Sequence, residues 1–139
     1  AHGLLNRFPQ HSYSFNRVRG TLRGMHWQKE PGMETKVVTC VRGAVLDLVV
    51  DLRKDSKTYC KWAGVELSSE NRRMLYITKG FAHGFQTLTD DTELFYQITP
   101  EYAAGLATGV RWDDPAFGIQ LPIEVTVIQD KDKQFPDFT

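Results

Sequence analysis

The sequence predicts an all-β domain, built as an antiparallel sandwich or barrel. Short runs of apolar and β-branched residues recur along the 139-residue chain. Turn residues separate these runs at intervals of about 8–12 residues, a spacing typical of such folds. No segment has the period of a strong amphipathic helix, so alternating strand and helix units are not expected. The length is that of one domain, and we expect residues 1–139 to form a single domain.

The first half of the chain predicts three strands after an irregular opening. Residues 1–19 mix aromatic and polar side chains and are expected to form irregular chain with a short strand. Lys29-Glu30-Pro31-Gly32 is a strong turn signal and predicts that a first hairpin reverses there. The strands are expected at 21–28, 36–41 and 44–51, the last of them buried and interrupted by the carboxylates of Asp47 and Asp51.

The second half predicts four more strands and a long irregular tail. The strands are expected at 59–67, 74–77, 85–89 and 92–98. Asp90-Asp91 separates the last two, which predicts a hairpin. The tail from Arg111 to Pro136 is polar and contains several prolines. We expect it to pack over a sheet as loop and short turns, a path that can carry a carboxylate back to a pocket.

The composition bounds the partners of the protein. Lysine and arginine together number 17, as do aspartate and glutamate, so no overall charge attracts nucleic acid or an anionic membrane. No apolar run approaches the roughly 18 residues of a membrane-spanning helix. Cys40 and Cys60 fall in strand-like runs, and residues 1–39 do not have the pattern of a signal peptide. We interpret them as buried, reduced thiols of a cytoplasmic protein rather than as a disulfide or a zinc site.

A group of acid–base side chains suits the abstraction of a proton from a carbon next to a ketone. His26 suits the base, because imidazole is basic and uncharged at neutral pH, and a carboxylate from the tail, Asp132 or Asp130, would fix its tautomer. Lys36 suits the enolate oxygen as a point charge. Tyr96 suits the acid that returns a proton on the opposite face. Such a reaction is an epimerisation, and it calls for no metal or organic cofactor.

Each of these residues also has an ordinary structural explanation. A histidine in a strand, such as His26 or His83, is more often a hydrogen-bonded core or interface residue than a catalyst. Tyr96 in an apolar strand is by default a core aromatic, and Lys36 a solvated strand-edge lysine. Arg23 could simply pair with a surface carboxylate. Spacing alone therefore leaves the function undetermined.

Five motifs that occur in order along the chain are more specific. They are Arg23-Gly24-Met25-His26-Trp27-Gln28, Val41-Arg42-Gly43-Ala44-Val45-Leu46-Asp47, Val50-Asp51-Leu52-Arg53, Gly80-Phe81-Ala82-His83-Gly84-Phe85 and Trp112-Asp113-Asp114-Pro115. Together they resemble the dTDP-4-dehydrorhamnose 3,5-epimerase family, and the match runs in order from about Phe8 to Pro136. The resemblance implies a cupin-type antiparallel β jelly roll with short peripheral helices or turns. It also implies a homodimer that acts, without a metal or other cofactor, on a nucleotide-linked 4-keto-6-deoxy sugar.

The resemblance also assigns roles by position. His26 matches the proton acceptor of the family and Tyr96 its proton donor. Lys36 matches a lysine that binds the substrate. Asp132 matches the carboxylate paired with the base histidine, with Asp130 as its rival because the Asp-Lys-Asp register is ambiguous. The residues assigned to substrate binding are Arg23, His83, Gln28 and Ser12.

Some positions depart from the family pattern. Ser12 stands where the family usually has asparagine, and Ala104 and Ala107 stand where proline and a substrate-binding glutamate are common. We expect the chain to lack a further N-terminal segment, whose arginine and glutamate reach the nucleotide in other members. These departures concern recognition of the substrate. Whether one carbon or two are inverted, and on which nucleotide sugar, therefore stays open.

Three other functions compete with epimerisation. A catalytically silent module that binds sugar nucleotides would keep the fold, but it has no evident need for an opposed acid and base. A metal-dependent cupin oxygenase would use His26 and His83, but His26-Trp27-Gln28 offers no second histidine close by. A keto-sugar isomerase would use similar enolate chemistry and would differ in where the carbonyl ends up.

Overall fold

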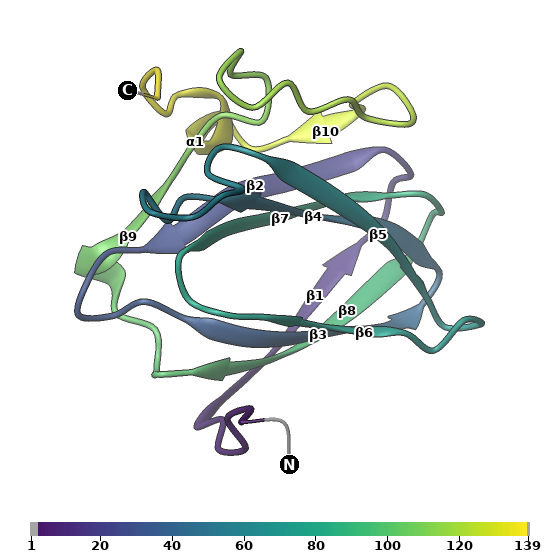
Figure 1. The fold of residues 1–139 in the computed structure, drawn as a ribbon. Coiled ribbons are helices and arrows are strands. Elements are labelled where there is room, and N and C mark those ends of the chain that lie inside the picture. The colour runs from purple at the N-terminus through teal and green to yellow at the C-terminus, as the bar shows by residue number, and fades with distance from the viewer. Residues whose placement is uncertain (1–2, 139) are drawn as a thin grey trace.

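The computed structural model describes residues 3–138, which fold almost entirely as β structure (Figure 1). The elements in chain order are β1 (Gln10–Asn16), β2 (Thr21–Gln28), β3 (Thr35–Arg42), β4 (Ala44–Asp51), β5 (Trp62–Ser68), β6 (Met74–Ile77), β7 (Phe81–Thr87), β8 (Thr92–Thr99), the 3-10 helix η1 (Ala104–Leu106), β9 (Ala107–Gly109), β10 (Val127–Ile128) and α1 (Asp130–Lys133). Among these residues no helix is long and apolar enough to cross a membrane.

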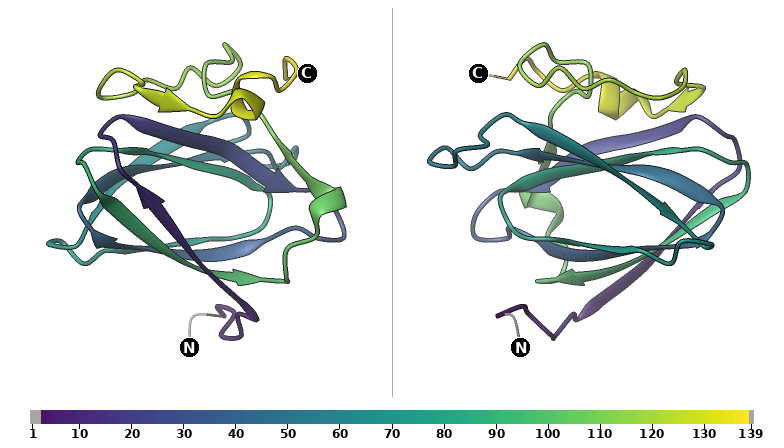
Figure 2. Two further views of the ribbon diagram at one scale, coloured as in Figure 1. Left: turned by 180° about the vertical axis from the view of Figure 1, so that it is seen from behind. Right: turned by 45° about the vertical axis from the view of Figure 1, so that its right-hand side comes forward.

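The strands form two sheets that face each other. The smaller sheet has the order β1-β8-β3-β6. The larger sheet has the order β10-β2-β7-β4-β5, and β9 also pairs with β2. All pairings are antiparallel except that of β10 with β2. Figures 1 and 2 show the two layers with the C-terminal tail lying over the larger sheet. The predicted all-β jelly roll is confirmed.

Both predicted hairpins are wrong. Strands β2 and β3 flank the turn at residues 29–32 but belong to different sheets, and so do β7 and β8 on either side of Asp90-Asp91. Each of these strands pairs with strands distant in sequence instead, as β2 does with β7 and β3 with β8. A turn signal predicts where the chain reverses, but not whether the next strand joins the same sheet or crosses to the other one.

One hydrophobic core fills part of the space between the two sheets. It consists of side chains from both layers: Val38, Cys40, Val45, Leu67, Ile77, Phe85 and Leu94. Cys40 is a free thiol in this core, and burial raises its pKa. Cys60 is also a free thiol, but the prediction that it is buried in a strand is wrong, because it is only partly buried and lies in the turn before β5. Because the core occupies only part of the space, polar side chains line the remainder.

A second core lies between the larger sheet and the tail. Leu48 and Val50 of β4 point to this outer side, where they meet Phe117 and Ile119 of the tail. With both faces covered, β4 has the nearly continuous apolar sequence of a strand buried on both sides. The tail also pairs with the sheet through β10, and Thr126 donates a hydrogen bond from its amide to the carbonyl of Gly20. The predicted packing of the tail over a sheet is therefore observed.

The alternation in β1 is the reverse of that in an ordinary surface strand. Ser12 and Ser14 point inward, whereas Tyr13 and Phe15 point outward and are 73% and 50% exposed. In an antiparallel sheet with one face in solvent, the apolar side chains normally face the core. The inner side of β1 is thus polar enough to bind a ligand, and its outer side is apolar enough to need a cover.

The turn after β4 is fastened by one buried carboxylate. Asp51 accepts hydrogen bonds from the guanidinium and amide of Arg53 and from the hydroxyls of Ser56 and Thr58. The guanidinium hydrogen bonds are the main cause that holds the pKa of Asp51 well below its usual range. The hydroxyls and the amide add to this effect and together outweigh the opposing effect of burial. The guanidinium also stacks on the ring of Phe81 at 4.7 Å.

We expect Asp51→Asn to lower the free energy of unfolding at pH 7 by about 2 kcal/mol, since it weakens several charge-assisted hydrogen bonds. A carboxylate with a depressed folded pKa stabilises the protein above its unfolded pKa of about 3.9 and loses this effect as the pH falls. The deficit of the variant should therefore shrink between pH 5 and pH 3 in urea unfolding curves. Asp55→Asn, in the exposed part of the same turn, is the control. A deficit that stays constant with pH would contradict the prediction.

Candidate active site

His26 and Asp132 form a close pair between the larger sheet and the tail. The imidazole Nε2 lies 2.6 Å from Asp132 Oδ1, and the amide of Gly24 donates to Oδ2 at 3.1 Å. Asp132 is fully buried on α1, whereas 38% of the His26 side chain is exposed. An ionised Asp132 accepts a hydrogen bond from the protonated Nε2, which leaves Nδ1 as the unprotonated, basic nitrogen. Asp130, the rival candidate, is 82% exposed and pairs with Lys133 instead.

The electrostatics of Asp132 favour its ionised form. Burial raises the pKa of this carboxyl. The hydrogen bond and charge of His26, the amide of Gly24 and the charge of Lys131 outweigh burial and hold the pKa below its usual value. The carboxylate is therefore charged at neutral pH and can fix the imidazole next to it.

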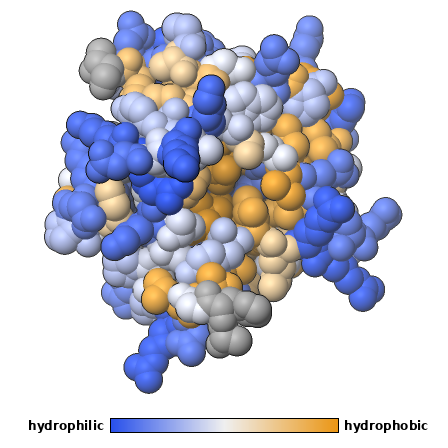
Figure 3. All heavy atoms as spheres, in the orientation of Figure 1, coloured by the Kyte–Doolittle hydropathy of each residue, from blue (hydrophilic) through white to orange (hydrophobic). Residues whose placement is uncertain are grey.

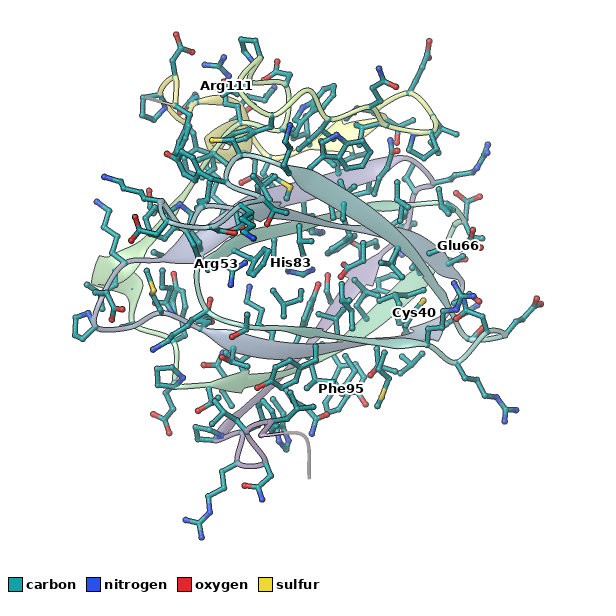
Figure 4. All side chains as sticks on the ribbon, in the orientation of Figure 1. Cys40, Arg53, Glu66, His83, Phe95 and Arg111 are labelled. Atoms are coloured by element: carbon teal, nitrogen blue, oxygen red, sulfur yellow. The ribbon has the colours of Figure 1, made fainter. Side chains whose placement is uncertain are left out.

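A second histidine–carboxylate pair lies deeper, between the two sheets (Figure 4). His83 Nε2 is 2.8 Å from Asp47 Oδ1, and both side chains are almost completely buried. Asp47 Oδ2 has no hydrogen-bond partner among the described residues. Sequence reasoning did not name Asp47 as a site residue, although a carboxylate within the buried run 44–51 was the signal that could have found it. Adjacent strands place the pair, since β4 and β7 are neighbours.

A pocket of about 250 Å³ brings together side chains from both sheets. Arg23 and His26 come from β2 and His83 from β7, all in the larger sheet. Lys36 of β3 and Tyr96 of β8 come from the smaller sheet. The pocket is thus open between two layers, each of which contributes groups able to move or hold a proton.

A larger cavity of about 410 Å³ adjoins this pocket. His26, Lys36 and Ile98 line both spaces. The aromatic side chains of Trp27, Tyr102 and Phe135 line the cavity together with Gln10, Gln28, Glu34, Ala107, Thr108 and Lys131. On the face of the molecule that Figure 3 shows, hydrophobic side chains gather in a central hollow surrounded by hydrophilic ones.

Lys36 has a carboxylate next to it. Its Nζ lies 3.6 Å from Glu34 Oε1, and the two side chains are only 13% and 9% exposed. No hydrogen bond joins either side chain to another residue within 3–138, so both retain their capacity to bind a ligand. Glu34 was not predicted, because a charged residue directly after the turn at 29–32 reads as a solvated one.

The predicted substrate-binding residues line the two spaces but differ in their surroundings. Arg23 lies in the smaller pocket and donates from Nε to Asn16 Oδ1 at 2.6 Å. Ser12 lines the same pocket and accepts a hydrogen bond from Gln10. Gln28 lines the larger cavity, where its Oε1 accepts from the amide of Ala103, while its Nε2 has no partner among the described residues.

Comparisons with known proteins identify the family. The family model for dTDP-4-dehydrorhamnose 3,5-epimerase matches residues 1–139. The chain belongs to this family. A dTDP-4-dehydrorhamnose 3,5-epimerase of Sinorhizobium fredii is 46% identical over 128 residues, which cover 91% of this chain and 66% of that protein. The chain thus spans about two thirds of the length of this relative. The family that the motifs predicted is confirmed.

Solved structures agree with this assignment. The dTDP-4-dehydrorhamnose 3,5-epimerase of Bacillus anthracis, with TDP and PPi bound, is 40% identical and superimposes with a TM-score of 0.94, covering 98% of this chain and 78% of that one. A 3'-monoepimerase of Streptomyces bikiniensis, in complex with dTDP-quinovose, is 35% identical with a TM-score of 0.87 and covers 94% and 66%. The comparisons therefore support a sugar-nucleotide epimerase, an isomerase, within this family.

Metal-ligating side chains are not clustered in the described part of the chain. Within 3–138 no three His, Cys, Asp or Glu side chains are placed to hold a metal ion together. Each site histidine is instead bonded through Nε2 to a single aspartate. The described residues thus do not form the donor set that a metal-dependent cupin oxygenase would need.

We expect Asp132→Asn to change the tautomer of His26. The new amide can keep accepting from Gly24 only by turning its NH₂ group toward His26 Nε2, which must then accept, so the ring proton moves to Nδ1. Nitrogen-15 NMR of the imidazole at pH 8 should show Nε2 protonated in the wild type and Nδ1 protonated in the variant. Asp130→Asn, two residues away and exposed, should leave the wild-type pattern; an unchanged pattern in Asp132→Asn would refute the prediction.

Proposed function

We propose that the chain is a nucleotide-sugar epimerase that inverts carbon 3, carbon 5 or both of a dTDP-4-keto-6-deoxyhexose. The observation that carries this proposal is the pocket that His26, Lys36 and Tyr96 line together. These residues lie on three different strands, and each has a chemically distinct part in proton transfer next to a ketone. The dTDP-quinovose bound to the 3'-monoepimerase of Streptomyces bikiniensis and the TDP bound to the enzyme of Bacillus anthracis support the substrate class.

The two adjoining spaces suit the two parts of such a substrate. The sugar ring would occupy the pocket of about 250 Å³, where His26 and Tyr96 project from opposite sheets. The nucleotide would extend into the cavity of about 410 Å³, which has aromatic walls and Lys131 at its edge. Aromatic side chains can stack on a base, and a lysine can bind a phosphate as a point charge.

The proposed reaction begins with removal of a proton from a carbon next to the ketone. His26 Nδ1 takes the proton, and Asp132 stabilises the imidazolium that results. The electron pair of the broken C–H bond forms the enolate, whose negative charge on the former ketone oxygen is stabilised by Lys36. A proton is then delivered to the opposite face of the same carbon. The centre is inverted with no net oxidation and no co-reactant.

Tyr96 suits the proton donor. Burial, together with the charge of Asp47, raises the pKa of Tyr96, so the phenol stays protonated at neutral pH. The charge of Arg23 and the hydroxyl of Ser14 act in the opposite direction, and both would stabilise the phenolate after transfer. The ring stands edge-to-face with that of His83 at 6.2 Å. In this proposal His83, oriented by Asp47, and Arg23 hold the oxygen atoms of the sugar.

The proposal is tested by solvent-deuterium exchange into dTDP-4-keto-6-deoxyglucose, followed by proton NMR. The wild type should remove the signals at both carbons that flank the ketone, and His26→Ala should abolish exchange at both. Tyr96→Phe should retain some exchange but impair inversion, because it removes the donor and leaves the base. Undiminished exchange in His26→Ala would reject His26 as the base.

Two alternatives appear as outcomes of the same experiment. Exchange at one carbon only would indicate a single-site epimerase, an activity like that of the similar 3'-monoepimerase of Streptomyces bikiniensis. Binding of the sugar nucleotide without exchange at either carbon would indicate a catalytically silent module. A product whose carbonyl has moved would indicate a keto-sugar isomerase.

The outer face of the smaller sheet supports a homodimer as the working form. Tyr13, Phe15, Val41 and Met74 are exposed there, and Tyr13 packs on Phe95 at 5.0 Å between ring centroids. Phe95 lies on the side of its sheet away from His83 (Figure 4). An aromatic surface on a flat sheet is typical of protein interfaces, and the same face of a second copy is its natural partner under two-fold symmetry.

We expect the wild type to have twice the 15.9 kDa mass of one chain in light scattering. Tyr13→Glu should shift the protein toward the monomer, because it introduces two buried charges into the symmetric interface. Val18→Glu is a matched control, since Val18 is also apolar and exposed but lies outside the strands. A monomeric wild type would remove this part of the proposal.

A further inference from the structure

The last turns of the tail bring a second side chain to His26. Besides Asp132, which binds Nε2, Phe135 stands edge-to-face to the imidazole with the ring centroids 6.3 Å apart. Phe135 also lines the larger cavity together with His26. Two tail residues that lie three positions apart therefore make a polar contact and an aromatic contact to the same ring.

The sequence makes room for this aromatic ring. Gly109 of β9 is the direct strand partner of His26, and a side chain there would overlap the ring of Phe135. Arg111, two residues further along, donates to the carbonyl of Phe135 at 3.4 Å and to the carboxylate of Asp137 at 2.7 Å. A glycine opposite His26 thus leaves space for the ring, and an arginine binds the backbone of the residue that carries it.

His26 needs a second restraint because one hydrogen bond does not fix a ring. The imidazole can still tilt about its Nε2···Oδ1 contact, and 38% of the side chain is open to solvent. Nδ1 must point at one carbon of the substrate, and a misplacement of about 1 Å can cost about 100-fold in rate. A neighbouring aromatic ring limits this tilt and keeps water from that side of the base.

We propose that Phe135 is a positioning residue for proton transfer, which holds the His26 imidazole at the angle that aims Nδ1 into the smaller pocket. The tail then supplies both restraints on the base, the carboxylate and the aromatic wall. The part of this inference that concerns rate rests on the proposed function. The part that concerns the orientation of the imidazole does not.

The test compares Phe135→Ala with Phe138→Ala. Phe138 belongs to the same tail but packs on Phe117 and Tyr59, away from both pockets, so it reports any general loosening of the tail. At saturating sugar nucleotide, Phe135→Ala should slow deuterium exchange by about 10-fold to 100-fold, while Phe138→Ala stays within about threefold of the wild type. Phe135→Tyr should restore the rate, since it keeps the ring.

Imidazole NMR at pH 8 provides a readout independent of activity. In the wild type and in Phe138→Ala, the two nitrogen-15 signals of His26 should be well separated, as for one fixed tautomer. In Phe135→Ala they should move toward each other, because a ring that tilts away from Asp132 Oδ1 loses the hydrogen bond that fixes its tautomer and then samples both tautomers.

The outcomes separate this inference from the proposed function. Unchanged exchange at saturation, with weaker binding of TDP alone, would make Phe135 a wall of the nucleotide cavity and overturn the inference. Equal losses in both alanine variants would also overturn it. If the wild type shows no exchange, the proposed function fails, and the NMR comparison still decides whether Phe135 orients His26.

Discussion

The rest of the structure depends on the need to cover the outer face of the larger sheet. Strand β4 carries apolar side chains on both sides, so Leu48 and Val50 would lie in water if the tail did not pack over them. Burial of each such side chain is worth about 1.5–3 kcal/mol. The covering tail must therefore run across the sheet, and α1 then lies where Asp132 reaches His26 and Gly24. One segment thus supplies both the hydrophobic cover and the carboxylate that binds His26.

In strand β1 of the smaller sheet, polar side chains face the interior and aromatic side chains face outward. Ser12 and Ser14 face the pocket, while Tyr13 and Phe15 face outward. Polar side chains inside the sandwich are stable only where a ligand or water forms hydrogen bonds with them. The hydrophobic core is therefore confined to part of the space between the sheets. The apolar groups displaced from the interior then accumulate on the outer face. A ligand pocket and a self-association surface thus follow from the same alternation in β1.

Most strands could be predicted from the sequence, as could residues that line the pocket, such as His26, Lys36 and Tyr96, whereas the way the strands assemble could not. Alternation and turn residues located β4 and β8 to within a residue or two. They did not reveal that β2 and β3 lie in different sheets, because sheet membership depends on contacts with strands distant in sequence. The choice between Asp130 and Asp132 likewise required the direction of each side chain on α1. The sequence did not indicate a site role for Asp47, Glu34 or Phe135. Each of them is explained equally well as an ordinary surface or core residue until its position beside the pocket is known.

The two-sheet architecture also explains how one site can present groups to both faces of a flat ring. The proposed base, His26, comes from the larger sheet, while Lys36 and the proposed acid, Tyr96, come from the smaller one. A substrate between the sheets therefore meets the base and the acid from opposite directions, which inversion of a carbon centre requires. The cost is that several charged groups are buried close together. The fold limits this cost by pairing each of them: Asp132 with His26, Asp47 with His83 and Glu34 with Lys36. Both histidines contact their aspartates through Nε2, so the Nδ1 atom of each ring remains available to a ligand. The pairs that make the buried charges tolerable therefore also set the orientation of the two imidazoles.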